Sequence, residues 1–230
     1  MSQPTFAQPT RGPYDIVVTA FVGLLLISNV AAVKLIQFGP DVEVLGFPVL
    51  PIITDGGFIL FPLTYVIGDV LAEVYGLKGA RRAIILGFVM AAIASLTFLL
   101  VGIAPPAADW PFQESYDDIL GFVPRIVLAS LAAYAVGQFL NAWVLVKIKS
   151  RAPEGSLWVR LLGSTLVGQA ADTVVFCMVA FYGVLTGANM VNYILVGYVY
   201  KVLVEVLVLP LTYRAVAFVK RREPAYRPVE

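Results

Sequence analysis

Six long apolar segments take up most of this chain of 230 residues. Only 13% of its residues are charged, and soluble domains average about 25%. A helix that crosses a lipid bilayer needs about 20 mostly apolar residues, and each segment has close to that length or more. We therefore predict an all-α integral membrane protein with six transmembrane helices, at about residues 15–37, 58–76, 80–104, 123–148, 160–187 and 190–218.

The basic residues between these segments predict the orientation of the helices. They gather from Lys78 to Arg82, around the turn between the fourth and fifth helices, and after the sixth helix. The connection 105–122 instead holds acids and no basic residue. Lysine and arginine are enriched in cytoplasmic connections, so we predict that both termini are cytoplasmic. The predicted parts are a polar N-terminal tail (1–13), the six-helix transmembrane domain (14–218) and a basic C-terminal tail (219–230).

The segment 39–57 lies between the first two predicted helices. It contains several prolines and glycines together with the acids Asp41, Glu43 and Asp55. Proline and glycine at this density are typical of turns and loops. We therefore expect a loop here, and one that re-enters the protein is possible.

The composition excludes several classes of function. The chain has no histidine, which excludes histidine metal sites, a Ser-His-Asp triad and a histidine proton relay. A net charge of +1 argues against a nucleic-acid partner bound through its phosphates. The single cysteine, Cys177, cannot form an intrachain disulfide. There is also no Walker A motif, so we expect no ATP hydrolysis. We further expect no cofactor, no metal and no enzymatic activity.

Two acids, Asp69 and Glu73, interrupt the second apolar segment. Their spacing puts them on one face of a helix, with Tyr65 one turn earlier. An ionised carboxylate near the bilayer centre costs roughly 2.5–3.5 kcal/mol and marks a candidate functional site. The other predicted helices carry Asn29, Lys34, Gln138, Asn141, Gln169, Asp172, Thr173, Asn192, Lys201 and Glu205. Since lipid cannot satisfy these groups, we expect them to converge on the interior of the bundle.

Structural explanations compete with functional ones for several of these residues. Lys201 and Glu205 are four residues apart and could form an ion pair within one helix. Amides such as those of Gln138 and Asn141 could hydrogen-bond between helices, at about 0.6 kcal/mol each. Glu73 lies near the basic run that begins at Lys78, so it is either a gate or a boundary residue.

Two short sequence matches join distant helices. Gly137-Gln138 with Asn141 resembles Gly168-Gln169 with Asp172, and the tetrapeptide 62–65 recurs at 210–213. A duplicated three-helix unit, as in many transporters, would explain both matches. Chance in a biased composition would explain them equally, and the sequence leaves the two explanations open.

The stretch Pro62-Leu-Thr-Tyr-Val-Ile-Gly-Asp-Val-Leu-Ala-Glu-Val-Tyr-Gly76, with Arg81-Arg82 and Gly87-Phe88 after it, resembles the queuosine precursor transporter family, also called the vitamin uptake transporter family. The resemblance extends over about 14–218. Its further positions are Ser28-Asn29, Lys34, Arg125, Ala129-Ser130, Gly137-Gln138, Asn141, Gly168-Gln169, Asp172-Thr173, Lys201 and Glu205. It implies a bacterial inner-membrane protein with a bundle like that of vitamin-binding S-components. It also implies import of 7-cyano- or 7-aminomethyl-7-deazaguanine, the precursors of the tRNA base queuosine.

The polar residues suit such a substrate. A 7-deazaguanine presents an N1–H and an amine side by side, and one carboxylate can accept both. Amides can serve its O6 edge because they donate and accept, and aromatic rings can stack on its plane. We hypothesise that Asp69 or Asp172 binds the amine edge. The other predicted substrate-binding residues are Gln138, Asn141, Gln169, Asn29 and Tyr65, and the predicted gating or coupling residues are Glu73, Lys201 and Glu205.

Other functions remain as alternatives. An S-component-like subunit for another vitamin or nucleobase, working with a separate energising complex, would look similar. An intramembrane aspartyl protease would use Asp69 and Asp172 as its dyad, but Asp172 lacks a matching motif. Proton coupling and facilitated diffusion both remain open. We expect a small-molecule substrate and the lipid bilayer as partners, and a homodimer as the assembly.

Overall fold

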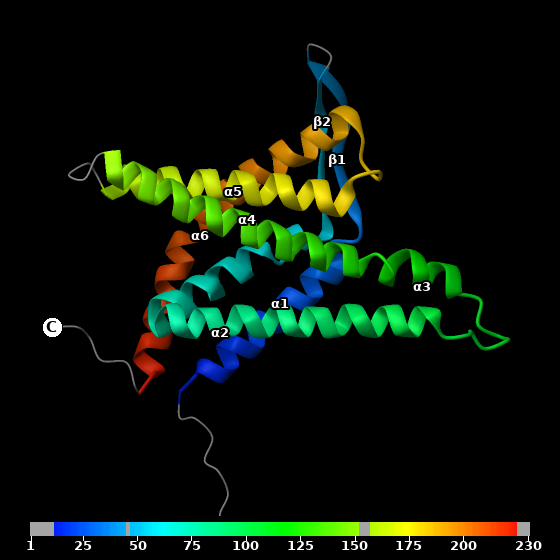
Figure 1. The fold of residues 1–230 in the computed structure, drawn as a ribbon, viewed down its shortest axis with the longest axis horizontal. Coiled ribbons are helices and arrows are strands. Elements are labelled where there is room, and N and C mark those ends of the chain that lie inside the picture. Colours follow the sequence, from blue (N-terminus) through cyan, green and yellow to red (C-terminus); the bar gives the residue numbers. More distant parts are fainter. Residues whose placement is uncertain (1–11, 45–46, 152–156, 225–230) are drawn as a thin grey trace, which may run out of the picture.

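The computed structural model describes residues 12–44, 47–151 and 157–224 of the chain (Figure 1). Within them, five helical stretches are long and apolar enough to cross a membrane, which agrees with the predicted class of helical membrane protein. The elements in chain order are α1 (Tyr14–Ala31), β1 (Leu35–Val44), β2 (Phe47–Asp55), the 3₁₀ helix η1 (Gly56–Ile59), α2 (Phe61–Ile103), α3 (Gln113–Leu120), α4 (Val123–Arg151), α5 (Leu157–Phe181) and α6 (Gly187–Arg222).

The 43 residues of α2 form two helical arms that meet at Gly76. Gly76 has φ 67° and ψ −177°, a conformation that is essentially restricted to glycine. The chain turns back at this point (Figure 1). Leu71 and Ala83 consequently share one buried cluster with Val18 of α1, although they would lie about 18 Å apart along a straight helix. The break falls where the predicted helix 58–76 ends.

The beginning of α1, the break in α2 and the end of α6 lie on the same side of the molecule. The Tyr14 hydroxyl donates a hydrogen bond to the carbonyl of Gly79 at 3.0 Å. The side chain of Glu223, just after α6, lies directly against Gly12. These contacts join the two ends of the bundle to the part of α2 that carries the basic run 78–82.

The segment 39–57, expected to be a loop, belongs mostly to a β-hairpin. β1 and β2 pair antiparallel, from Leu35 opposite Asp55 to Val44 opposite Phe47. The prediction of an all-α fold is therefore wrong at this point. Proline is tolerated on edge strands, and each strand of a two-stranded hairpin has a free edge. The valines and isoleucines of the segment favour strands, and its prolines did not exclude them.

Other boundaries differ from the predicted ones by a few residues. α1 ends at Ala31 instead of 37, and α5 ends at Phe181 instead of 187, before Gly183 with its φ of 83°. α6 continues to Arg222, so part of the predicted C-terminal tail is helical. The predicted N-terminal tail lies outside the described residues except for its last two. The short helix α3 lies within the acidic connection.

The largest buried cluster fixes the hairpin to the helices. Phe181 of α5 is 1% exposed, and its ring centre lies 5.2 Å from that of Tyr193 on α6, edge to face. Ile126 of α4 and Ile53 of β2 belong to the same cluster. An isolated two-stranded hairpin is marginally stable at best, so packing against α4, α5 and α6 stabilises this one.

Replacement of Gly76 tests the break in α2. We expect Gly76→Ala to lower stability by about 1–3 kcal/mol, because the backbone there is strained for any residue with a Cβ. Thermal unfolding of the purified protein in detergent measures the change. Gly68→Ala in the same helix is the matched control, since a Cβ there would meet nothing within 4 Å. Equal melting temperatures for the two variants would contradict the break.

Candidate functional site

α4 and α5 cross at two glycines. A Cβ on Gly137 would lie 2.9 Å from the Cβ of Asp172, and a Cβ on Gly168 would lie 2.8 Å from the Cβ of Asn141. Small residues of this kind allow the backbones of membrane helices to approach closely. The contact is reciprocal, because each glycine faces the polar residue four positions after the glycine of the other helix. The repeated Gly-Gln pattern is therefore the contact surface of a helix crossing.

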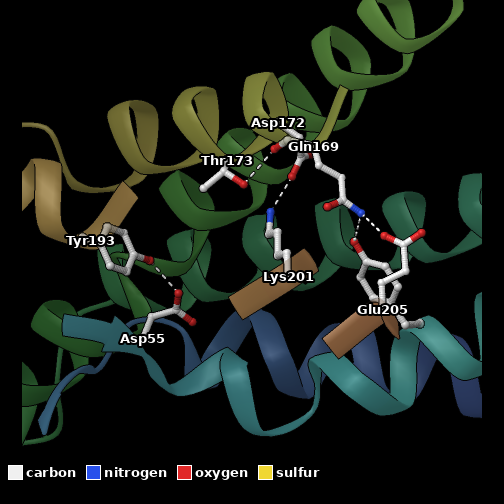
Figure 2. A network of polar contacts seen from close by, with 8 residues as sticks. Asp55, Gln169, Asp172, Thr173, Tyr193, Lys201 and Glu205 are labelled. Atoms are coloured by element: carbon white, nitrogen blue, oxygen red, sulfur yellow. Dashed lines mark hydrogen bonds and ion pairs between the residues drawn. The ribbon is translucent and has the colours of Figure 1, made fainter. Parts of the chain in front are cut away.

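Lys201 joins α6 to α5 through an ion pair. Its Nζ lies 2.5 Å from Oδ2 of Asp172 (Figure 2), and the two side chains are 17% and 31% exposed. The same ammonium lies 5.5 Å from the ring centre of Phe61, within the range of a cation–π interaction. Lys201 thus pairs with a carboxylate of the neighbouring helix and not with Glu205 on its own helix.

Gln169 joins three helices. Its Nε2 donates to a carboxylate oxygen of Glu205 on α6 and lies 3.5 Å from the hydroxyl oxygen of Tyr65 on α2 (Figure 2). Its Oε1 is buried and has no hydrogen-bond partner among the described residues. A buried acceptor without a partner costs about 1–3 kcal/mol, so an N–H group of a ligand would be stabilised here.

Asp69 lies one turn after Tyr65 on α2. Its side chain is exposed, and its charge interacts with that of Glu205. In the described part of the chain, neither of these two carboxylates forms an ion pair. Asn141 adds a second buried acceptor, Oδ1, without a partner among the described residues. We define the polar network as Tyr65, Asp69, Asn141, Gln169, Asp172, Lys201 and Glu205. The part of it around Asp69, Gln169 and Asn141 is therefore rich in free acceptors.

Asp55 is not among the residues that the sequence points to. Tyr193 of α6 donates to its Oδ2 at 2.5 Å, and the N–H of Gly57 donates to its Oδ1 at 2.8 Å. Burial raises the pKa of the Asp55 carboxyl, while these hydrogen bonds and the charge of Lys201 oppose the rise. An aspartate before two glycines is a local signal for a cap. Its bond to Tyr193, 138 positions away, has no local signal.

Three predicted site residues lie outside the polar network. Asn29 accepts a hydrogen bond from Ser130 at 3.5 Å and lines an apolar cavity of about 450 Å³ between α1, α2 and α4. Gln138 is exposed on α4. Glu73 accepts from Lys220 at 2.7 Å, which joins α2 to the end of α6. The predicted substrate contacts of Asn29 and Gln138 and the predicted gating role of Glu73 therefore gain no support from this arrangement.

Apolar helices around a polar interior of carboxylates, amides and one lysine are typical of a small-molecule transporter. Residues 55–215 match the family model described as "Putative vitamin uptake transporter". This match covers well over half of the chain, and the chain belongs to this family. The resemblance to this family that the stretch 62–76 carries is thereby confirmed.

Curated bacterial relatives of the chain are described as queuosine precursor transporters. The chain is 35% identical over 162 residues to the "Probable queuosine precursor transporter" of Bacillus subtilis (strain 168), covering 69% of this chain and 70% of the relative. It is 28% identical over 169 residues to the "Queuosine precursor transporter" of Escherichia coli (strain K12), covering 72% of each. No solved structure matches. The apolar helices and these relatives identify a multi-pass protein of the bacterial inner membrane.

The helix crossing can be tested by adding one methyl group. We expect Gly137→Ala to lower stability by about 1–3 kcal/mol, as overpacking does, because the new Cβ would lie 3.0 Å from the carbonyl oxygen of Gly168. Thermal unfolding in detergent measures the loss. Gly163→Ala on α5 is the control, since the new Cβ would lie 3.4 Å from its nearest neighbour, Cδ1 of Ile148, which is an ordinary van der Waals distance. An unchanged melting temperature for Gly137→Ala would rule out the close crossing.

Proposed function

We propose that the chain imports 7-deazaguanine precursors of queuosine, with a 7-cyano or a 7-aminomethyl arm, across the bacterial inner membrane. The relatives named above support the substrate class. The observation that carries the proposal is the junction of α2, α5 and α6, where Gln169 holds Glu205 and Tyr65 and keeps a buried, unpaired acceptor. Such a junction suits a flat ligand with several N–H donors.

The proposed topology has six crossings, made by α1, the two arms of α2, α4, α5 and α6. The reversal at Gly76 supports the count, because it divides α2 into two arms. Both termini are cytoplasmic in this proposal. The start of α1 and the end of α6 lie beside the basic run 78–82, which is expected in the cytoplasm. The hairpin and the acidic connection 105–122 then face the outside.

The structure favours Asp69 over Asp172 as the carboxylate that binds the amine edge of the ring. Lys201 already neutralises Asp172, whereas Asp69 has no cation partner among the described residues. One carboxylate can accept the ring N1–H and the exocyclic amine together. The free acceptors of Gln169 and Asn141 would take further N–H groups. Glu205 would then stabilise a cationic aminomethyl arm.

The ion pair of Lys201 and Asp172 is the proposed gate. It joins α5 to α6 within the interior, so opening it frees one helix to move relative to the other. Protonation of Asp69 or Glu205 is the proposed route for proton coupling, since the chain has no histidine. Glu73 acts as an anchor through Lys220. The homodimer stays a prediction.

The aspartyl-protease alternative fits the site less well than a transporter does. In an aspartyl protease the two carboxylates share one proton because like charges lie together, but here Asp172 contacts an ammonium group. An S-component-like subunit for another vitamin or nucleobase would bind its ligand and fail to transport it alone. We would measure uptake of the precursors by cells in which this chain is the only transporter for them. Uptake by these cells indicates a transporter that works alone, and its absence indicates an S-component-like subunit.

Replacement of Asp69 tests the binding role. In a strain that cannot make the precursors, we expect Asp69→Asn to weaken uptake of labelled deazaguanine by about 10- to 150-fold, the equivalent of one charged hydrogen bond at 1.5–3 kcal/mol. Asp118→Asn, an exposed acid on α3, is the control and should transport normally. Uptake with and without a proton gradient decides the coupling. Full uptake by Asp69→Asn would remove this residue from the site.

Reversal of the ion pair tests the gate. We expect Asp172→Asn and Lys201→Gln each to lower both the melting temperature and the uptake rate, because each leaves one charge unpaired. The double variant Asp172→Lys with Lys201→Asp should recover the melting temperature, because the two charges are paired again. It should not recover the uptake rate, because the positive charge is then on α5 and the negative charge on α6. Recovered uptake in the double variant would show that the pair only holds the helices together.

A further inference from the structure

Five aromatic side chains form a continuous series from the hairpin to the polar network. Neighbouring ring centres lie 4.5–6.3 Å apart, which is the range of direct aromatic contact. The members of this aromatic series, in spatial order, are Phe38 of β1, Phe58 of η1, Tyr200 of α6, and Phe61 and Tyr65 of α2. Three separate elements and the hairpin thus contribute to one row of rings.

The two ends of the series differ in character. Phe38 is 48% exposed and belongs to the hairpin. The hairpin lies away from the break in α2 (Figure 1). At the other end, Tyr65 contacts Gln169, and Phe61 lies beside the ammonium of Lys201. The series therefore joins the hairpin to the groups that the proposed function assigns to substrate binding.

The rings of the series meet at an angle to one another. The four pairs have interplanar angles from 41° to 75°, so no two rings are stacked face to face. The hydroxyl of Tyr200 donates to the carbonyl of Phe58 at 2.8 Å, which holds α6 against η1. The outer rings are thus fixed in position and meet edge to face.

We propose that the aromatic series is the entry route for the substrate, and that Phe38, Phe58 and Tyr200 form a first binding site for a planar heteroaromatic ring. This inference rests on the proposed function and orientation. Stacking of a base on an aromatic side chain contributes a factor of about 5 to 150 in affinity per ring. It requires no particular hydrogen bond, so a ligand can pass from one ring to the next. The polar network then selects by hydrogen bonds.

The competing explanation is that the rings only pack the hairpin against α6. Substitutions that keep apolar bulk and remove the flat face separate the two explanations. We therefore compare Phe58→Leu with Phe58→Trp, and Phe38→Leu with Phe38→Trp. Phe112→Leu is the matched control, because Phe112 is 56% exposed and its ring contacts Trp110 in the connection before α3, outside the series.

The first measurement is uptake of labelled 7-cyano-7-deazaguanine over a range of concentrations, by cells that cannot synthesise it. We expect both leucine variants to raise the half-saturating concentration at least fivefold, with the maximal rate kept, and both tryptophan variants to restore it. The Phe112→Leu control should match the unmodified chain. Leucine variants with an unchanged half-saturating concentration would overturn the proposal. If Phe58→Leu does not accumulate in the membrane, the comparison of Phe38→Leu with Phe38→Trp, at an exposed position, decides between the two explanations.

The second measurement detects the first site directly. We measure the tryptophan fluorescence of the Phe58→Trp protein in proteoliposomes and subtract that of the unmodified protein. This difference should fall, and the fall should saturate, as 7-cyano-7-deazaguanine is added outside. The fall should persist when Asp69→Asn is added, because the outer rings precede the polar network. Absence of quenching would overturn the first site. Quenching without uptake by the unmodified chain would instead overturn the proposed function and leave the first site in place.

Discussion

The backbones of α4 and α5 touch at Gly137 and Gly168. This contact fixes the position of α5 in the bundle, and with it the position of its polar side chains. Lipid tails are as apolar as leucine, so no hydrophobic force draws membrane helices together, and close packing has to do so. The two glycines provide this packing and bring Asp172 and Asn141 to the crossing itself. Any larger residue there would move α5, and with it the partners of Lys201.

Each polar contact of the interior connects two or more separate elements. The ion pair joins α5 to α6, the amide of Gln169 joins α5 to α2 and α6, and Tyr193 joins α6 to the hairpin. A buried charge is costly unless it is paired, so these groups tie the helices to one another. α6 takes part in all three contacts, and a shift of α6 would reach the hairpin and the polar network together.

The sequence predicts the helices well, because apolar length and helical spacing are local properties. The end of a helix at Gly76 is one such success. The sequence predicts the polar interior only in part, since Asp69 and Gln138 are exposed. Spacing fixes the face of a helix but not the neighbour that meets it, so the partner of Lys201 could not be derived. Gln138 and Asn141 are three residues apart, yet only Asn141 is partly buried. The hairpin was obscured by its prolines.

The hairpin has a consequence for the order in which the protein is made. The hairpin contacts α6 through Ile53 with Asn192 and Asp55 with Tyr193, and η1 just after it contacts α6 through Phe58 with Tyr200. The sequence separations are 139, 138 and 142 residues. A ribosome adds about 5–20 residues per second, so the hairpin waits many seconds for its partners. The end of the bundle that carries the hairpin is therefore the last part to assemble, and a chain released before α6 would leave it open.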